Sequence, residues 1–289
     1  MVFRSIFGLV LVSTFLFSCD DKDDVSDTSG PRLIVKFKFD PNQERLNNIG
    51  QPSTVTLGNA AQSPAFNSIS SHYLELAPLA TTQLGQGEIL YHAPETMIGG
   101  ERAIDFSKSK IVAEGESFLS IPISQIQAGS YEWVRCSLAY QNYTINIWNS
   151  GTNLVGNLGS FVGFNTYITT HSLGASNFAV NSNRKQGYWA LSVAGLPFSG
   201  QAPEGATTVP NPLATTSPIP AGSCVVTGKF AEKLVITGNE TQDVVVTLSL
   251  SVNNSFEWQE VNVDGKFEPN AGENVVDMGL RGLIPSYVK

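Results

Sequence analysis

Apolar and polar side chains alternate with a period of two along most of this 289-residue chain. In the segment 32–40, every second residue is apolar: Leu33, Val35, Phe37 and Phe39. This alternation is typical of a half-buried strand, because successive side chains of a strand point to opposite faces. Similar runs, rich in Val, Ile, Thr and aromatic residues, occur at 72–76, 88–92, 118–123, 131–138, 143–148, 161–170, 187–193, 225–230, 234–237, 244–252 and 256–261. No window shows a convincing helical period, so the pattern predicts an all-β fold, an antiparallel β-sandwich of about ten strands.

Two long irregular stretches interrupt the strands. Residues 40–65 are polar and rich in Gly and Asn, and residues 196–222 contain six prolines. Loops of this length are uncommon in compact domains and are usually functional or mobile. The second stretch would also suit a domain linker. We nevertheless expect residues 32–289 to form one β-sandwich domain, because a disulfide between Cys136 and Cys224 would tie the two sides together. No repeat of fixed period is visible, which disfavours propellers and solenoids.

The N-terminus has the features of a secretory signal. Arg4 precedes an apolar segment, 6–17, which is too short to span a bilayer as a mature helix. Ser18 and Cys19 follow at the expected cleavage position. Residues 1–18 are therefore the predicted signal peptide. Residues 19–31 form a predicted flexible tether, because their clustered aspartates repel one another and cannot pack.

This N-terminus resembles that of a bacterial lipoprotein. The run Leu16-Phe17-Ser18-Cys19 is similar to a lipobox, in which the cysteine is acylated, for example with palmitate, and becomes the mature N-terminus. The acidic run 20–24 resembles the export signal of Bacteroidota-type surface lipoproteins. The resemblance implies lipidation at Cys19 and an outer-membrane protein exposed on the cell surface. An ordinary signal peptide with an incidental cysteine, and an anchor facing the periplasm, are the alternatives.

The net charge of the chain limits the classes of partner that it is expected to bind. The formal net charge of −8 argues against nucleic acid and against peripheral binding to anionic lipid, since both require a basic surface. No second apolar stretch approaches the length of a transmembrane helix. The acyl anchor is therefore the expected attachment to the membrane.

The two remaining cysteines, Cys136 and Cys224, are expected to form one disulfide in an oxidising compartment. The alternative is two buried free thiols that pack as small apolar side chains. Neither cysteine has the spacing of a thiolate zinc site.

A C-terminal segment has the pattern of a calcium loop. Oxygen ligands at alternate positions precede a glycine, as in loops that turn sharply around a hard cation. The helices and final bidentate acid of an EF-hand are missing. The segment resembles instead the Asx-x-Asp-Gly loops of secreted β proteins, and this resemblance implies a structural ion rather than a catalytic one. A plain wide turn is the alternative. The candidate ligands are Glu260, Asn262, Asp264, the Lys266 carbonyl, Glu268, Glu273 and Asp277.

The three histidines, His72, His92 and His171, are far apart in sequence and lie in or beside predicted strands. A lone strand histidine is usually just hydrogen-bonded. If the fold brought two of them together with Met97 or Met278, however, they would offer a soft-metal site that suits copper. His92 and Met97 lie on the same short segment.

One further resemblance points to copper. The unit from Ile126 to Leu138 combines a turn, a Gly-x-Tyr motif and a long strand, and Gln186-Gly-Tyr-Trp189 follows later. This order is similar to that of the copper-binding β-sandwich proteins of the MbnP type. The resemblance implies a β-sandwich that handles copper, but it does not locate the family's metal residues in this chain.

No catalytic arrangement is visible: the Gly-x-Ser-x-Gly and Gly-x-x-x-x-Gly-Lys motifs are absent. The sequence thus predicts a non-enzymatic, lipid-anchored surface protein whose β-sandwich binds a ligand or a partner. Copper handling is the first alternative. Carbohydrate binding or processing is the second, with aromatic segments such as 140–143 and 187–189 as sugar platforms and Glu88, Glu95, Glu101 and Asp105 as the acids.

Overall fold

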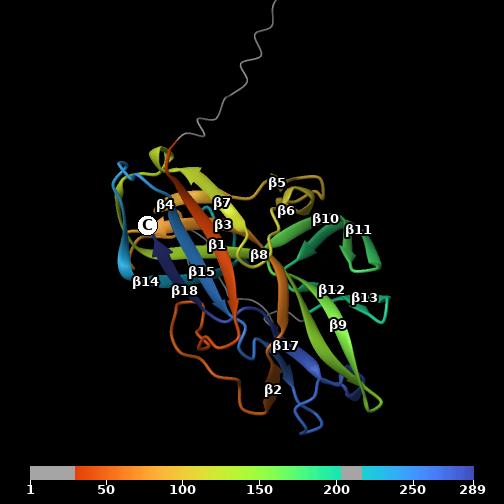
Figure 1. Cartoon of the computed structure of the whole chain (residues 1–289). Helices are drawn as coiled ribbons and strands as arrows, with labels where there is room; N and C mark the ends of the chain where they lie inside the picture. Colours follow the sequence, from red (N-terminus) through yellow and green to blue (C-terminus); the bar gives the residue numbers. More distant parts are fainter. Residues whose placement is uncertain (1–29, 203–216) are drawn as a thin grey trace, which may run out of the picture.

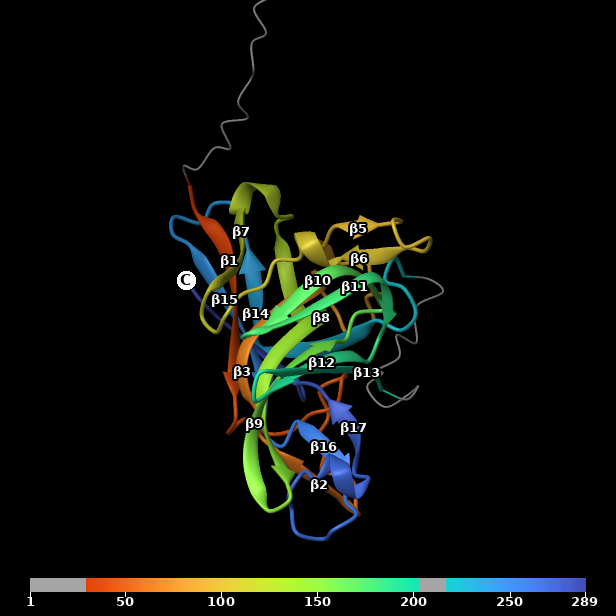
Figure 2. The same ribbon diagram turned by 90° about the vertical axis from the view of Figure 1, so that its right-hand side faces the viewer.

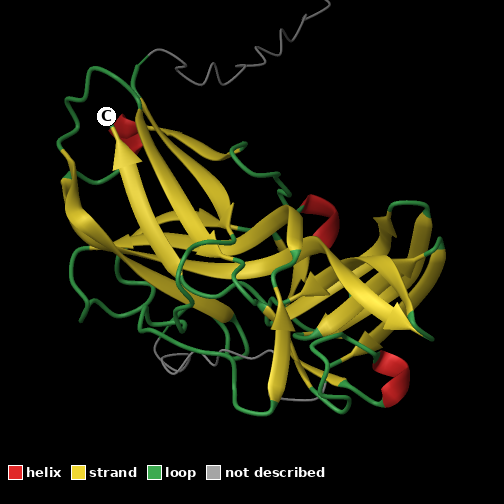
Figure 3. Cartoon of the chain, turned by 60° about the horizontal axis from the view of Figure 1, so that its bottom comes forward, coloured by secondary structure: helices red, strands yellow, loops and turns green. Residues whose placement is uncertain are grey.

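The computed structural model describes residues 30–202 and 217–289, which form strands β1 to β18 and three short 3-10 segments (Figures 1 and 3). The described residues contain no α-helix, so the predicted all-β fold is confirmed. None of them belongs to a helix with the length and apolarity needed to cross a membrane. The predicted signal peptide, Cys19 and all but the end of the tether lie outside the described residues.

The β1 sheet is the first wall of the core. Its four strands run in the order β18 (Leu283–Val288), β15 (Val244–Ser251), β1 (Arg32–Asp40) and β7 (Ser117–Pro122). The pairing of β1 with β15 is parallel, with Leu33 opposite Val244, whereas the other two pairings are antiparallel. The first and last parts of the chain therefore lie side by side in this sheet (Figure 1).

The β8 sheet is the second wall, built around one strand of 21 residues, β8 (Gly129–Asn149). One edge of β8 pairs with β3, and the other pairs with β14 along its first half and with β9 along its second half. The remaining members extend these neighbours. The strands are β13 (Leu196–Gln201), β12 (Tyr188–Val193), β9 (Thr152–Phe161), β3 (Ala65–Ala77), β4 (Glu88–His92) and β14 (Cys224–Ile236).

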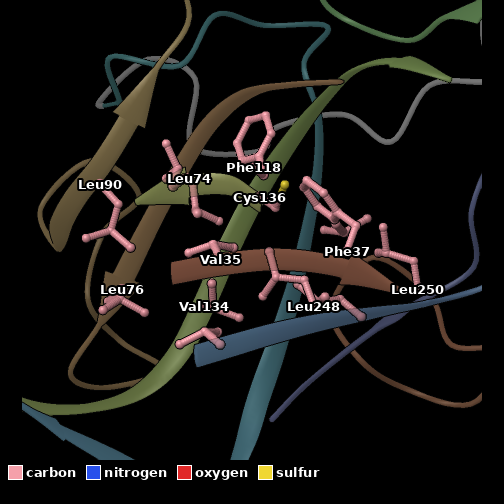
Figure 4. Packing of buried hydrophobic residues seen from close by; sticks show 14 of the residues in the cluster. Val35, Phe37, Leu74, Leu76, Leu90, Phe118, Val134, Cys136, Leu248 and Leu250 are labelled. Atoms are coloured by element: carbon pink, nitrogen blue, oxygen red, sulfur yellow. The ribbon is translucent and has the colours of Figure 1, made fainter. Parts of the chain in front are cut away.

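The main core lies between these two walls. The residues predicted on the inner face of β1 are buried, and Figure 4 shows Val35 and Phe37 beside Leu248 of β15 and facing Leu74 of β3 and Val134 of β8. Burial of each such side chain contributes about 1.5–3 kcal/mol. The alternation read from segment 32–40 is thus confirmed as a strand with one buried face.

Two smaller sheets flank the β8 sheet (Figure 2). The β10 sheet has the order β11 (Ser176–Lys185), β10 (Asn165–Leu173), β6 (Ala103–Asp105) and β5 (Glu95–Thr96). The β16 sheet has the order β17 (Asn274–Met278), β16 (Phe256–Gln259) and β2 (Asn59–Gln62). The 3-10 segments are η1 (Phe106–Lys108), η2 (Ile123–Gln125) and η3 (Pro269–Ala271).

The strands outnumber the ten or so expected, because several lack the alternating pattern. β5 and β6 are two and three residues long. β13 has an exposed and Gly/Pro-containing sequence inside the expected loop 196–222, where antiparallel pairing with β12 gives it strand geometry. In the stretch 40–65, only β2 and an isolated bridge between Leu46 and Pro52 break the irregular backbone.

The predicted disulfide is wrong: Cys136 and Cys224 are both free and buried. They lie on paired strands, but Cys224 is opposite Leu138 while Cys136 is opposite Val226. Such diagonal neighbours are about 7–8 Å apart, beyond the usual span of a disulfide. Burial raises the pKa of both thiols to about 12, so both remain protonated apolar side chains of the core.

Candidate metal centre

The site begins with a local irregularity in β3. Ser71 is opposite Leu138 of the antiparallel strand β8. Tyr73, two residues after Ser71, is opposite Ser137, which is only one residue away from Leu138. His72 is therefore the extra residue of a β-bulge. A bulge leaves its residue out of the regular pairing and redirects its side chain, which explains how a histidine can leave the alternation of the strand.

The other two side chains of the site, His92 and Glu95, come from the segment that folds back over this bulge. β4 pairs with β3 so that His92, its last residue, is opposite Tyr73, and the Ala93 N–H donates to the His72 carbonyl at 2.7 Å. Ala93 and Pro94 then turn the chain from β4 into β5. Glu95, the first residue of β5, is thereby carried onto the same spot as the two histidines.

The three side chains converge closely. His72 Nε2 lies 2.9 Å from Glu95 Oε1, and His92 Nε2 lies 3.6 Å from the same oxygen. The two imidazole rings are 4.8 Å apart between centroids. One ligand atom from each residue can be chosen so that all lie within 4.8 Å, and no other such group of three His, Cys, Asp or Glu side chains occurs in the described residues.

Electrostatics leave Glu95 ionised. Burial opposes its ionisation, but the hydrogen bond with His72 and those from Arg102 outweigh that cost and lower the pKa of Glu95 to about 2. Arg102 donates to both carboxylate oxygens, from Nη2 to Oε1 at 2.9 Å and from Nε to Oε2. Glu95 is therefore a permanent anion that Arg102 orients from the side of β6.

The histidines differ in their access to water. His72 is fully buried and packs on the Phe164 ring, whereas the His92 side chain is 37% exposed. Burial, and next the nearby His72 ring, lower the pKa of His92. The His92 ring is thus neutral at neutral pH and keeps a lone pair for a cation. The centre is closed on the His72 side and open to solvent at His92.

The predicted set of copper ligands is only partly brought together. His72 and His92 meet, well inside the separation that a shared ion allows. Met97 lies in the turn after β5 with 64% of its surface exposed. His171, on β10, is instead surrounded by aromatic rings, with Nε2 at 3.4 Å from the Tyr140 hydroxyl. Glu95 was missing from the predicted ligands, although its spacing three residues after His92 is a usable signal.

The C-terminal loop brings its acidic residues onto donors of its own backbone. Glu273 is buried, and its carboxylate accepts from the N–H groups of Val261 at 3.1 Å and Glu268 at 2.6 Å. Glu260 accepts from the Asp264 N–H at 3.1 Å. A calcium ion would compete with these donors for the same oxygens.

The other predicted ligands in this region have polar partners as well. The Asn262 amide donates to Glu268 at 2.7 Å, and Asp264 pairs with Lys266 at 2.8 Å. Asp277 pairs with Arg281. Calcium binding here stays a prediction.

Three of the four acids considered for a glycan site have partners of their own. Glu101 is exposed and pairs with Lys185, whereas Asp105 is buried, caps η1 and pairs with Lys108. Glu88 accepts from the Gln127 N–H at 3.3 Å. Three of the aromatic side chains considered as sugar platforms are buried: Tyr140, Tyr143 and Tyr188. These three pack as core residues, whereas Trp189 is half-buried, and carbohydrate binding stays a prediction.

No protein family, curated protein or solved structure matches this chain. The convergence of His72, His92 and Glu95 is therefore the feature from which a function can be argued.

Proposed function

We propose that this chain is a non-enzymatic binding protein whose ligand is a divalent transition-metal cation, held by His72, His92 and Glu95. The observation that supports the proposal is the approach of two imidazoles and one carboxylate to within 4.8 Å. Two nitrogens and one oxygen suit Zn²⁺ or Cu²⁺. The soft Cu⁺ ion fits less well, because the Met97 thioether is exposed on a neighbouring turn.

The residues fit such a cation in three respects. Glu95 supplies the negative charge at any physiological pH, and His92 is neutral. Arg102 holds the carboxylate in place, as a residue behind a ligand commonly does. Exposure of His92 gives an ion a path from solvent and leaves room for water to complete the coordination.

Titration calorimetry of the purified protein with Zn²⁺ and with Cu²⁺ tests this proposal. We expect one equivalent to bind, and His92→Ala to remove most of the affinity while leaving the fold intact. The matched control is His171→Ala, which removes the chain's third histidine from a different sheet. Absence of uptake by the wild type, or equal affinity in the His92 and His171 variants, would overturn the proposal.

We also propose that the protein is carried on the outer membrane by acylated Cys19 and faces the outside of the cell. The lipobox-like run 16–19 and the acidic run 20–24 support this location. Mass spectrometry of the mature N-terminus tests the anchor, and protease treatment of intact cells tests the exposed face. An unacylated terminus that starts at another residue would overturn the anchor.

A further inference from the structure

Away from the metal centre, the structure contains an apolar cavity of about 380 Å³ between the β8 sheet and the β16 sheet. It lies where β8 and β9 extend beyond the main core and β16 and β17 pack beside them (Figure 2). Folded proteins pack their interiors densely and leave few voids larger than a water molecule. A cavity of this size has the volume and the lining of a small-molecule pocket.

The lining is mainly hydrocarbon. β8 contributes Ile145 and Ile147, β9 contributes Leu158, β12 contributes Leu191, and Phe256 and Met278 close the opposite side.

Two of the three polar side chains of the lining, Gln201 and Glu273, are already engaged. Gln201 donates through Nε2 to the Gln186 carbonyl at 2.7 Å. The Glu273 carboxylate accepts backbone N–H groups of the C-terminal loop. The negative charge of Glu273 also disfavours an anionic ligand. The occupant must therefore be recognised by apolar contact.

We propose that this cavity binds an uncharged, mainly hydrocarbon small molecule, such as an alkyl chain that ends in a hydroxyl group. Trp189, Leu191 and Val275 are only half-buried and line the same cavity, so apolar surface reaches the solvent at its mouth. Asn274 beside them is exposed and offers an amide to a polar end group. This site is independent of the metal proposed at His72, His92 and Glu95.

The methionines provide a direct test in the unaltered protein. Besides Met1, the chain has only Met97, which is exposed on a turn, and Met278, which is buried and lines the cavity. In protein labelled with ¹³C at the methionine methyl groups, titration with 1-decanol should move the Met278 signal to saturation and leave the Met97 signal in place. A Met278 signal that does not move, or that moves together with Met97 without saturating, would overturn the proposal.

A cavity-filling variant provides the second test. Val275→Phe places a ring in the cavity, and Val155→Phe is its control, since Val155 is 62% exposed and does not line the cavity. The affinity for 1-decanol should fall at least about tenfold in Val275→Phe, because a single methylene in an apolar pocket is already worth about that factor. It should be unchanged in Val155→Phe. Should Val275→Phe fail to fold, Leu191→Trp fills the same space; wild-type affinity in a folded filling variant would also contradict the proposal.

Discussion

At the scale of single residues, His171 shows how surroundings override the usual chemistry of a side chain. It is 6% exposed, and the rings of Phe106, Tyr140 and Phe161 pack around it. Burial lowers the pKa of His171 to about 4, from an ordinary value of 6.5. The charged form is therefore disfavoured in the folded protein but not in the unfolded one.

This difference predicts a pH dependence of stability. Between pH 6.5 and about 4 the unfolded chain holds a proton on His171 that the folded protein lacks. The contribution of His171 to the free energy of unfolding is therefore fully present above pH 6.5. It declines as the pH falls, by at most about 3 kcal/mol. We expect His171→Leu to reduce the loss of unfolding free energy between pH 7.5 and pH 5, measured with urea. An equally steep loss in the variant would rule out His171 as its source.

Gly159 of β9 lies directly against this histidine. A Cβ at Gly159 would lie 2.7 Å from His171 Nε2 and 3.2 Å from the Tyr140 hydroxyl. We predict that Gly159→Ala lowers the free energy of unfolding by about 1–3 kcal/mol, the usual cost of overpacking. Gly129→Ala is the control, since its new methyl group would meet only ordinary contacts of 3.4 Å or more. Thermal unfolding of both variants should separate them clearly.

At the scale of elements, β1 supports the main core through one face only. Phe37 is 1% exposed and contacts Phe118 of β7 edge to face, while Lys38 beside it points to solvent. Phe37→Ala should therefore cost about 3–5 kcal/mol. Lys38→Ala should stay within about 0.5 kcal/mol of the wild type. Chemical denaturation of the pair measures this contrast, and similar midpoints would contradict the assignment of the buried face.

The C-terminal loop leads to a prediction about its closing acid. Because Glu273 accepts several backbone N–H groups while buried, Glu273→Ala should lower the free energy of unfolding by about 2 kcal/mol or more. Glu268→Ala should cost less, since the Glu268 carboxylate accepts only an exposed side-chain amide.

If the loop also binds calcium, the unfolding midpoint of the wild type should be higher in calcium than in chelator. Equal midpoints would show that the loop closes without calcium.

Long strands with alternation could be predicted from sequence, and the elements around the metal centre could not. The pattern of segment 32–40 gives β1 and its buried face, because burial there follows the strand period. β5 is two residues long and depends on pairing with β6 for its existence. The bulge at His72 arises from a shift in pairing with β8 and leaves no mark on the sequence. The meeting of His72 with Glu95 is therefore a tertiary property.

At the scale of the whole molecule, the cysteines predict insensitivity to reductant. Sequence analysis predicted a disulfide between Cys136 and Cys224 from the number of cysteines. It could not reveal the register of β14 on β8, which places the two thiols diagonally. Since Cys136 and Cys224 are free, the unfolding temperature should be the same with and without dithiothreitol. Thiol titration in denaturant should detect both. A lower unfolding temperature in reductant would contradict the register of β14 on β8.

The parallel pairing of β1 with β15 has a consequence for the order of folding. β1 begins at Arg32, whereas its partner strand ends at Ser251. The β1 sheet is therefore complete only after contacts form between residues more than two hundred positions apart. Contacts of such high sequence separation slow folding, because a long loop must close before they form. In a growing chain, the edge of β1 that pairs with β15 stays without its partner until residues 244–251 have been made. The same arrangement that closes the core thus delays completion of the β1 sheet until β15 is present.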